Sequence, residues 1–491
     1  MNFGRQILDA FAANGDRVAM VSGHSRITYA QALVQVGHLA ANFKMSGLRP
    51  GDRVGLAMVD NIDVVLAILA CWKIDATPVV IDFRAPRSQR ARNIRDFALA
   101  MIFESRSPPG DDPYPGAIFQ ADWKNASPAA HAAPAGATGA HPAFLMFSSG
   151  TTGDPKAYIQ SHEALSGRVT ARKSTLDGTE KRLLTPMALS YSATRHQIFS
   201  YLLYGGTVNF FPPLFTPSEL IEGLLSFRAS GTSLPPPVIS RLVREVGQPA
   251  TSPLPDLRVL YSIGGPARPE DKLAAYRYIS SGYRISYASS LTGNISMLSG
   301  PDVLARPESA GRPFGGVRID IVDAEGHVLA NGETGLIKAW TSTMASAVLL
   351  PGNRPFIDPR IMGPNWGMPG DIGFLDDAGF LTIVDRESDM IVRGGVNVAP
   401  QELEKLIRAH PKVLDVAVTG FPDETMGQEI AVFIVTEHGT VDEFQAFLRA
   451  NISPDRRPRE VRLVASLPYS DNGKLLRRRL VETLSAQPPR E

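Results

Sequence analysis
Cysteine, unbalanced charge and long apolar runs are scarce in this sequence of 491 residues. Its single cysteine, Cys71, excludes an internal disulfide framework and a multi-cysteine metal site, which suits a reducing compartment. We expect Cys71 to be a small buried hydrophobe. Fifty lysines and arginines against 49 aspartates and glutamates leave a formal net charge of +1, so no overall field favours nucleic acid or an anionic membrane as a partner.

Long apolar segments are missing as well. The most apolar stretch, Val64 to Ala70, is far shorter than the ~20 residues that span a bilayer. The stretch from Met1 to Met20 carries charged side chains and lacks the apolar run that a signal peptide needs. We therefore expect no membrane span and a cytoplasmic location.

The chain is too long for one ordinary hydrophobic core, so we expect at least two domains. Near the amino terminus, helix-like runs alternate with short apolar strands, which predicts an α/β fold with parallel strands and crossover helices. The clearest helices are Tyr29 to Met45 and Asn61 to Lys73, and the clearest strands are Arg53 to Met58 and Thr77 to Ile81. Ser105 to Pro142 is irregular, with room for one short strand.

The rest of the chain indicates two further parts. Residues Gly311 to Lys338 are typical of short strands joined by turns, which predicts a small β-rich subdomain. Beyond the charged stretch 385–389, helices and strands alternate in a compact α+β unit. We expect a large domain of layered α/β subdomains over residues 1–384, a hinge at 385–389 and a small carboxyl-terminal domain over 390–491.

The most informative segment is Ser-Ser-Gly-Thr-Thr-Gly-Asp-Pro-Lys, from Ser148 to Lys156, directly after a predicted strand. Its hydroxyls, backbone N–H groups and lysine can all point at one polyanion, and a phosphate chain is the natural guest. The spacing differs from the Walker pattern, which argues against a P-loop kinase or GTPase. Taken alone, the segment also fits a flexible polar loop.

The segment resembles the Ser-Gly-Thr-Thr-Gly-x-Pro-Lys element of the adenylate-forming superfamily of acyl- and aryl-CoA synthetases, luciferases and peptide-synthetase adenylation domains. Further segments resemble the same superfamily in the same order. They are Ser-Ile-Gly-Gly-Pro at Ser262 to Pro266, Tyr-Ala-Ser-Ser at Tyr287 to Ser290, Gly-Asp-Ile-Gly-Phe at Gly370 to Phe374, Asp385-Arg386 with Arg393 to Pro400, and Pro-Tyr-Ser-Asp-Asn-Gly-Lys at Pro468 to Lys474.

The resemblance implies ATP, Mg²⁺ and CoA, or the phosphopantetheine arm of a carrier protein, as cofactors and partners of a small carboxylic acid. It implies Lys474, Thr151 and Tyr191 as catalytic residues, and a carboxyl-terminal domain that swings about the hinge. It also implies a set of residues that contact the nucleotide or the thiol. These are Ser148, Ser149, Gly150, Thr151, Thr152, Gly153, Lys156, Gly264, Gly265, Pro266, Tyr287, Ala288, Ser290, Asp371, Arg386, Gly394, Gly395 and Lys474.

The implied roles agree with elementary chemistry. A substrate carboxylate is ionised near neutral pH, so it needs positioning and charge neutralisation rather than a general base. The ammonium of Lys474 can bridge that carboxylate and the α-phosphate. Asp371 can accept from two ribose hydroxyls, Arg386 can donate to the same ribose, and Gly394-Gly395 would let a slim thiol arm pass. Read without the resemblance, Gly394-Gly395 is simply a turn.

The sequence departs from the superfamily's pattern at several positions. Leu291 stands where a glutamate usually helps to hold Mg²⁺, and a leucine cannot ligate a hard cation, so no metal ligand is assigned. Ser192 replaces the aspartate of enzymes for α-amino acids, which disfavours those substrates. Arg195 and His196 are expected on a helix surface, with a position facing a polar substrate as the alternative. The basic run from Arg477 to Arg479 is expected on a solvated face, with contact to the phosphates of CoA as the alternative.

Three readings remain open from the sequence. The first is an acyl- or aryl-CoA ligase, favoured by the run from Arg393 to Pro400. The second is a free-standing adenylation enzyme that loads a carrier protein, favoured by the likeness of Tyr191 to Gly206 to peptide-synthetase domains. The third is a degenerate nucleotide-binding protein, motivated by Leu291. The sequence does not reveal the acid.

Overall fold

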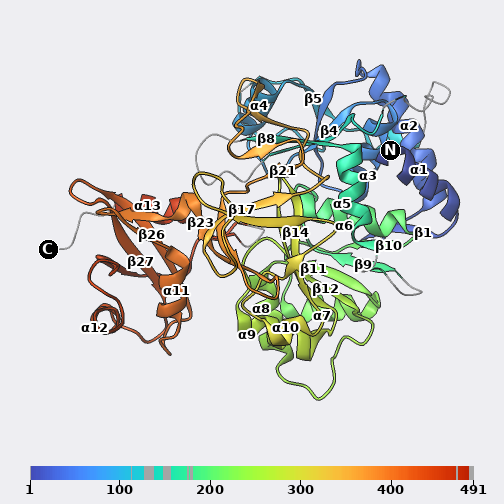
Figure 1. The fold of residues 1–491 in the computed structure, drawn as a ribbon. Coiled ribbons are helices and arrows are strands. Elements are labelled where there is room, and N and C mark those ends of the chain that lie inside the picture. Colours follow the sequence, from blue (N-terminus) through green and yellow to red (C-terminus); the bar gives the residue numbers. More distant parts are fainter. Residues whose placement is uncertain are drawn as a thin grey trace. The chain divides into compact units, whose positions relative to one another are not determined.

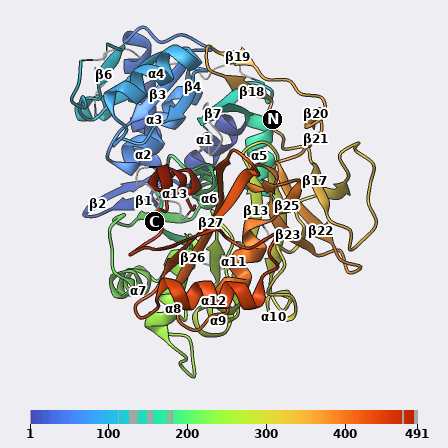
Figure 2. The same ribbon diagram turned by 90° about the vertical axis from the view of Figure 1, so that its left-hand side faces the viewer.

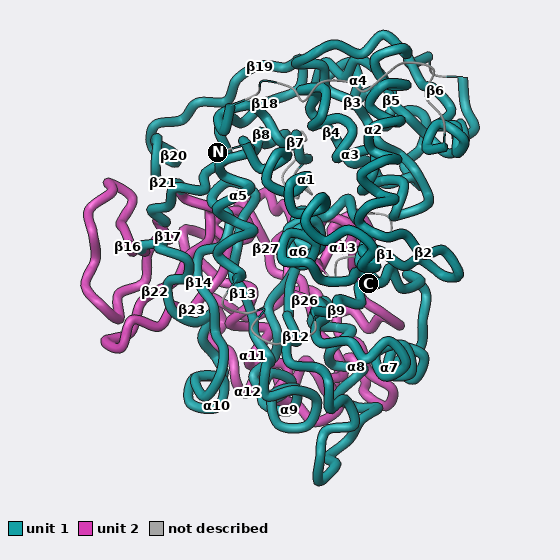
Figure 3. Tube along the Cα trace, turned by 90° about the vertical axis from the view of Figure 1, so that its right-hand side faces the viewer, with its two compact units in different colours: residues 1–150, 154–318, 339–367 teal, residues 151–153, 319–338, 368–491 magenta. Residues whose placement is uncertain are grey.

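Two compact units make up the computed structural model of the chain, which describes residues 2–111, 113–125, 136, 138–147, 156–173, 176, 181–470 and 474–485 (Figure 3). The first unit consists mainly of Met1–Gly150, Asp154–Arg318 and Ala339–Gly367, and the second of Ile319–Lys338 and Met368–Glu491. The expected hinge at 385–389 lies inside the second unit. Because compactness does not measure motion, the hinge and the boundary at residue 384 stay predictions.

The largest sheet of the first unit has a parallel centre and antiparallel edges (Figure 1). Its strands, in spatial order, are β15 (Arg312–Pro313), β14 (Gly293–Ser299), β13 (Tyr283–Ser289), β12 (Val259–Ser262), β11 (Gly231–Leu234), β9 (Arg182–Thr185), β10 (Thr207–Phe210), β1 (Val18–Ser22) and β2 (Ser25–Thr28). Strands β1, β10, β9, β11, β12 and β13 pair in parallel. Such strands need crossover connections, and helices supply them between β9 and β13, as the α/β prediction requires.

Two smaller sheets also belong to the first unit. The parallel sheet contains β4 (Thr77–Val80), β3 (Arg53–Ala57), β5 (Leu99–Glu104) and β6 (Gly116–Ile118). The antiparallel sheet contains β19 (Arg354–Pro355), β18 (Ala347–Leu350), β8 (Ala157–Ser161) and β7 (Pro142–Phe147). The predicted strands at Arg53 and Thr77 are confirmed, and β6 is the short strand expected in the irregular stretch.

Helices cover these sheets. They are α1 (Phe3–Asn14), α2 (Tyr29–Met45), α3 (Asn61–Lys73), α4 (Arg87–Phe97), α5 (His162–Thr170), α6 (Ser192–Leu203), α7 (Pro217–Ser226), α8 (Pro236–Val246), α9 (Pro269–Ala274) and α10 (Asp302–Ala305), with short helical turns at Ala121–Lys124 and Ala275–Ile279. The predicted helices at Tyr29 and Asn61 are confirmed to the residue. Within the described ranges, no helix is both long enough and apolar enough to cross a membrane.

Helix α3 lies at the centre of the largest hydrophobic core. Asp60 caps its start by accepting hydrogen bonds from the amides of Ile62 and Asp63. Every residue from Val64 to Trp72 is buried, because neighbouring elements enclose the helix on all sides. The indole of Trp72 donates to the carbonyl of Ala143 at 2.7 Å, which ties α3 to β7. Cys71 is fully buried, as expected.

The second unit has a β-rich part and an α+β part (Figure 2). Its strands are β16 (Arg318–Val322), β17 (Gly335–Trp340), β22 (Asp371–Leu375), β23 (Leu381–Arg386), β24 (Ile391–Arg393), β25 (Val396–Val398), β26 (Asp415–Asp423), β27 (Gly427–Val435) and β28 (Glu460–Leu463). The hairpin of β20 (Met362–Gly363) and β21 (Trp366–Gly367) belongs to the first unit and pairs with Ala339 and Trp340 at the end of β17. Helices α11 (Pro400–Arg408), α12 (Val441–Asn451) and α13 (Arg477–Ser485) and the turn Glu387–Asp389 complete it, as the predicted α+β unit requires.

A buried ion pair joins α4 to β5 in the first unit. Arg90 and Glu104 are each about 1% exposed and form a salt bridge. The second guanidinium nitrogen of Arg90 donates to the carbonyl of Phe83 at 2.7 Å, and the carboxylate also accepts from Ser107 and Tyr114. Because every partner is satisfied, the desolvation cost of both charges is offset.

Breaking this pair should destabilise the first unit strongly. Glu104→Leu leaves a buried guanidinium unpaired, and we expect it to lower the free energy of unfolding by about 3–5 kcal/mol, measured by urea denaturation. Arg84→Ala, which removes an exposed ion pair with Asp82, is the matched control and should cost less than about 1 kcal/mol. Equal losses in the two variants would contradict the assignment.

Candidate active site
Asp371 and Arg386 face each other across the antiparallel pair β22 and β23. The Nε atom of Arg386 lies 3.1 Å from Oδ1 of Asp371. The Asp371 side chain is only 5% exposed, whereas that of Arg386 is 41% exposed. The strand register therefore holds a carboxylate acceptor beside a guanidinium donor, and Arg386 keeps access to solvent.

Lys474 reaches the same region from the other end of the second unit. Its backbone is fixed to Ser470, whose N–H donates to the Lys474 carbonyl at 2.8 Å and whose hydroxyl accepts from the Lys474 N–H at 3.1 Å. Burial, followed by the positive charge of Arg386, lowers the pKa of Lys474 to about 8, and Asp389 and Asp371 partly oppose this. Three predicted residues from distant segments thus act on one another within one unit.

Gly394 and Gly395 form the two-residue turn between β24 and β25. Their φ angles of +55° and +84° lie in the left-handed region that glycine favours. A Cβ atom on Gly394 would approach the terminal methyl of Met426 to 2.5 Å, whereas one on Gly395 would meet nothing within 4 Å. The turn alone accounts for both glycines, and their contact with a thiol stays a prediction.

The predicted nucleotide residues of the first unit fall at three places. Lys156 precedes β8 and lies 4.2 Å from the centre of the Phe356 ring. Gly264, with φ of +98°, turns the chain after β12 and leads to Gly265 and Pro266. Tyr287 and Ala288 lie at the end of β13, and Ser290 lies in the turn that follows it. The loop Ser148, Ser149, Gly150, Thr151, Thr152 and Gly153 lies outside the described residues, so its predicted phosphate contacts, and the catalytic role of Thr151, stay predictions.

Position 291 does not offer a metal ligand. Leu291 is 7% exposed and belongs to an apolar cluster with Met344, Ala345 and Val348. Its neighbours Ser289 and Thr292 hydrogen-bond to each other through their hydroxyls at 2.9 Å. The described residues here therefore do not fit a protein-bound Mg²⁺, and no step of the chemistry is derived through one.

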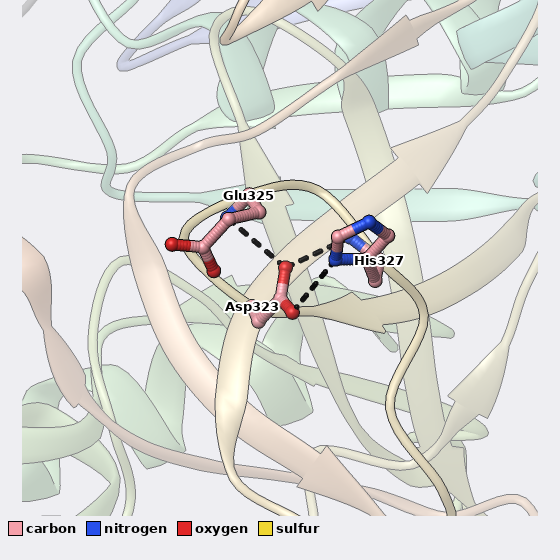
Figure 4. Close-up of side chains that lie close together, drawn as sticks. All are labelled: Asp323, Glu325 and His327. Atoms are coloured by element: carbon pink, nitrogen blue, oxygen red, sulfur yellow. Dashed lines mark hydrogen bonds and ion pairs between the residues drawn. The ribbon is translucent and has the colours of Figure 1, made fainter.

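One turn brings together three side chains that could each offer an oxygen or nitrogen atom to a metal ion, those of Asp323, Glu325 and His327 (Figure 4). The Asp323 carboxylate accepts from the backbone N–H of Glu325 at 3.0 Å and of His327 at 2.8 Å. It also contacts Nδ1 of His327 at 3.1 Å. These bonds are those of an Asx turn between strands, so the cluster is accounted for by chain reversal.

Helix α6 begins directly after Tyr191, the predicted aromatic wall. The prediction that Arg195 and His196 lie on its surface is wrong: they are 2% and 6% exposed. The helix is enclosed by α1, α5, β9 and β10, so it has no solvent face that polar residues could mark. Gln197, also buried, was not singled out in the sequence, although four consecutive polar residues from Thr194 to Gln197 were the available signal.

One prediction about the basic run is wrong, and two further buried arginines were not predicted. Arg477, expected on a solvated face, is instead 17% exposed and binds Glu404 at 2.6 Å, whereas Arg478 is 72% exposed. Arg168 and Arg172, at and beyond the end of α5, were not considered, although both are buried. Isolated arginines in a helical pattern are usually solvated, so the sequence carried no signal for them.

Comparison with known proteins gives the class. Residues 8–347 match the AMP-binding enzyme family, and residues 402–474 match the AMP-binding enzyme C-terminal domain. The chain is 28% identical over 490 residues to the long-chain-fatty-acid–CoA ligase FadD13 of Mycobacterium tuberculosis, covering 95% of this chain and 94% of that protein. It is 26% identical over 474 residues to a 2-succinylbenzoate–CoA ligase of Bacillus licheniformis, covering 95% and 96%.

A solved structure with the same fold is o-succinylbenzoate CoA synthetase from Bacillus subtilis, in complex with the acyl-adenylate intermediate OSB-AMP. Its TM-score is 0.85 at 22% identity, with 97% of each chain covered. The chain belongs to the AMP-binding enzyme family, within the adenylate-forming superfamily. By class it is an AMP-forming acid–thiol ligase of the acyl-CoA synthetase type, which confirms the predicted resemblance and fold.

Lys474 should titrate well below an ordinary lysine. In NMR of the ¹³C-methylated protein, we expect the resonance that Lys474→Arg removes to have its midpoint at about pH 8. Arg386→Met should raise that midpoint, because the charge of Arg386 lowers the pKa of Lys474. A midpoint near the ordinary lysine value of about 10.4 in the methylated protein that retains Arg386 would contradict this environment.

Proposed function
We propose that the protein activates a carboxylic acid with ATP, forming an acyl-adenylate and pyrophosphate, and then transfers the acyl group to the thiol of CoA. In the first step a carboxylate oxygen attacks the α-phosphorus and the bond to pyrophosphate breaks. In the second step the CoA sulfur attacks the acyl carbon, AMP leaves, and the thiol proton is released to solvent.

The observation that carries the proposal is the meeting of Lys474 with the Asp371–Arg386 pair. Asp371 and Arg386 offer one acceptor and one donor suited to a ribose, and Lys474 is placed where their charges act on it. A cation near the ribose site can reach the α-phosphate and the acid carboxylate, whose mutual repulsion it reduces. No general base is needed, because the acid is already ionised.

We propose CoA as the acceptor of the acyl group because the relatives compared above are named as CoA ligases. The carrier-protein alternative has no such support, and the presence of Lys474, Asp371 and Arg386 together argues against a degenerate protein. Mg²⁺ would be held by the ATP phosphates and water rather than by residue 291. We propose the cytoplasm as the location, where ATP and CoA are available.

Lys474→Ala should separate the two half-reactions. We expect ATP–pyrophosphate exchange to fall by about 100-fold or more, because the α-phosphate loses its cation, while CoA transfer from supplied acyl-adenylate changes less than about threefold. The exchange assay uses a panel of fatty, aryl, dicarboxylic and amino acids without CoA, so it also names the acid class.

The control for this experiment is Lys405→Ala, since Lys405 is an exposed lysine of the same unit. It should leave both half-reactions unchanged. If Lys474→Ala depressed both half-reactions equally, Lys474 would have only a structural role. Acid-independent or absent exchange in the parent enzyme would sink the proposed function itself.

Asp371→Ala should weaken ATP binding through the ribose. Hydrogen bonds to a charged group contribute about 1.5–3 kcal/mol, so we expect Kd for ATP to rise about 10- to 100-fold by calorimetry. The parent enzyme should discriminate against 2′-deoxy-ATP, and the variant should lose that discrimination. If Asp371→Ala kept the parent enzyme's preference for ATP over 2′-deoxy-ATP, Asp371 would not be the residue that binds the ribose hydroxyls.

A further inference from the structure
Arg477, the first residue of helix α13, is a largely buried cation that the proposed chemistry does not use. It follows Lys474 by three residues, and its side chain is 17% exposed, whereas that of its neighbour Arg478 is 72% exposed. A long cationic side chain is normally solvated, and it is enclosed where partners compensate its lost hydration. The partners of Arg477 therefore indicate its task.

Three carboxylates act on the guanidinium of Arg477. Its Nη1 atom donates to Oε1 of Glu404 at 2.6 Å and also to the carbonyl of Val418, and its Nε atom lies 3.5 Å from Oδ2 of Asp389. Burial opposes the charge, but Glu404, Asp389 and Asp385 outweigh it and raise the pKa of Arg477. The side chain therefore ties the start of α13 to helix α11, to strand β26 and to the turn that follows β23.

That turn, Glu387–Asp389, is here called the hinge turn, and it is fixed beside the predicted ribose site. The N–H of its first residue donates to the carbonyl of Gly370 at 2.9 Å, directly before Asp371. Asp385, at the start of the predicted hinge, is fully buried and accepts from the backbone N–H of Gln401, in the first turn of α11, at 2.9 Å. A side chain anchored on the hinge turn is thus anchored relative to the ribose site.

Lys474 belongs to the segment that Arg477 anchors. A narrow hairpin holds the backbone of this segment, in which the N–H of Leu476 donates to the carbonyl of Pro468 at 2.8 Å. The next residue is Arg477, so the arginine fixes the base of the hairpin on the hinge turn. Asp389 also acts on Lys474 itself, since it opposes the burial that lowers the pKa of that lysine. One carboxylate of the hinge turn therefore acts on both cations.

We infer that Arg477 is a positioning residue for the adenylation step. It holds the start of α13 on Glu404 and the hinge turn, and so keeps the Lys474 ammonium beside the Asp371–Arg386 pair. This inference rests on the proposed function. A lysine has a flexible four-carbon stem, so the position of its backbone decides where its ammonium can reach. Misplacement of a reacting group by about 1 Å can cost about 100-fold in rate.

The alternative role of Arg477, contact with the phosphates of CoA, has less support from these contacts. A phosphate would have to displace Glu404 from the guanidinium, and its charge would also meet the carboxylates of Asp385 and Asp389. Like charges at one site oppose binding, so the contacts favour an internal role.

Arg477→Met keeps an apolar stem and removes the charge. We expect kcat for acid-dependent ATP–pyrophosphate exchange to fall by about 10- to 100-fold, because Lys474 loses its placement, while KM for ATP and for the acid changes less than about threefold. CoA transfer from supplied acyl-adenylate should also change less than about threefold. Thermal melting of every variant is measured in parallel, so that a loss of folding is recognised.

Arg478→Met is the matched control, since Arg478 is the adjacent arginine of the same helix and its contact with Glu482, at 3.5 Å, is exposed. It should leave both half-reactions unchanged.

Two milder substitutions test the same contacts. Arg477→Lys keeps the positive charge without the planar fork and should recover part of the lost exchange. Glu404→Gln keeps an oxygen acceptor without its charge and should lower exchange by about 3- to 10-fold. They decide the question if Arg477→Met melts below the assay temperature, because exchange at the parent level in both would overturn the inference.

A double variant separates positioning from an independent role. If Arg477 acts through Lys474, adding Arg477→Met to Lys474→Ala removes nothing more, and exchange stays within about twofold of that of Lys474→Ala alone. A further loss as large as the one that Arg477→Met causes in the parent enzyme would show that Arg477 acts on its own, which overturns the inference.

The remaining outcomes distinguish this inference from the proposed function. A raised KM for CoA with unchanged exchange assigns Arg477 to the CoA phosphates, and an equal loss in both half-reactions assigns it a structural role only. Either result overturns the inference, while acid-dependent exchange by the parent enzyme upholds the proposed function. No acid-dependent exchange by the parent enzyme overturns both.

Discussion
The register of β22 against β23 is the constraint on which the chemistry depends. It places Asp371 opposite Arg386, so the acceptor and donor for a ribose are positioned by backbone hydrogen bonds rather than by flexible side chains. Burial, and after it the charge of the nearby Arg386, lowers the pKa of Lys474, and Asp371 partly opposes this. A one-residue slip of that ladder would turn either side chain to the other face and dissolve the arrangement.

Local patterns predicted much of the fold and little of the interior. The ranges of helices α2 and α3 were predicted to the residue, and the structure shows that Thr28 and Asp60 cap their starts. The proximity of Asp371 to Lys474 could not be derived from spacing, since only the resemblance to a family joined segments so far apart. Arg195 and His196 were misplaced because burial of α6 depends on elements that surround it, which its own residues do not encode.

The departures from the family pattern gain a physical meaning from the structure. Leu291 is a core residue among Met344, Ala345 and Val348, so its apolar character is required by packing as well as forbidding metal ligation. Gly394 and Gly395, which match the family pattern, also owe their identity first to local structure, a tight hairpin turn. In both cases the local structure gives a sufficient reason for the residue, and any functional role is additional to it.

The alternation of side chains along β12 and β13 has a consequence for how this enzyme can change. Tyr261 and Ile263 point to the side on which Ala193 of α6 packs, whereas Ser262 and Tyr283 point to the other side of the sheet. Substitutions of the side chains that face α6 change the packing of that layer directly and reach the opposite layer only through the backbone of the sheet. The sheet thereby insulates the stability of one half of the unit from variation in the other, which is a favourable starting point for divergence among related sequences.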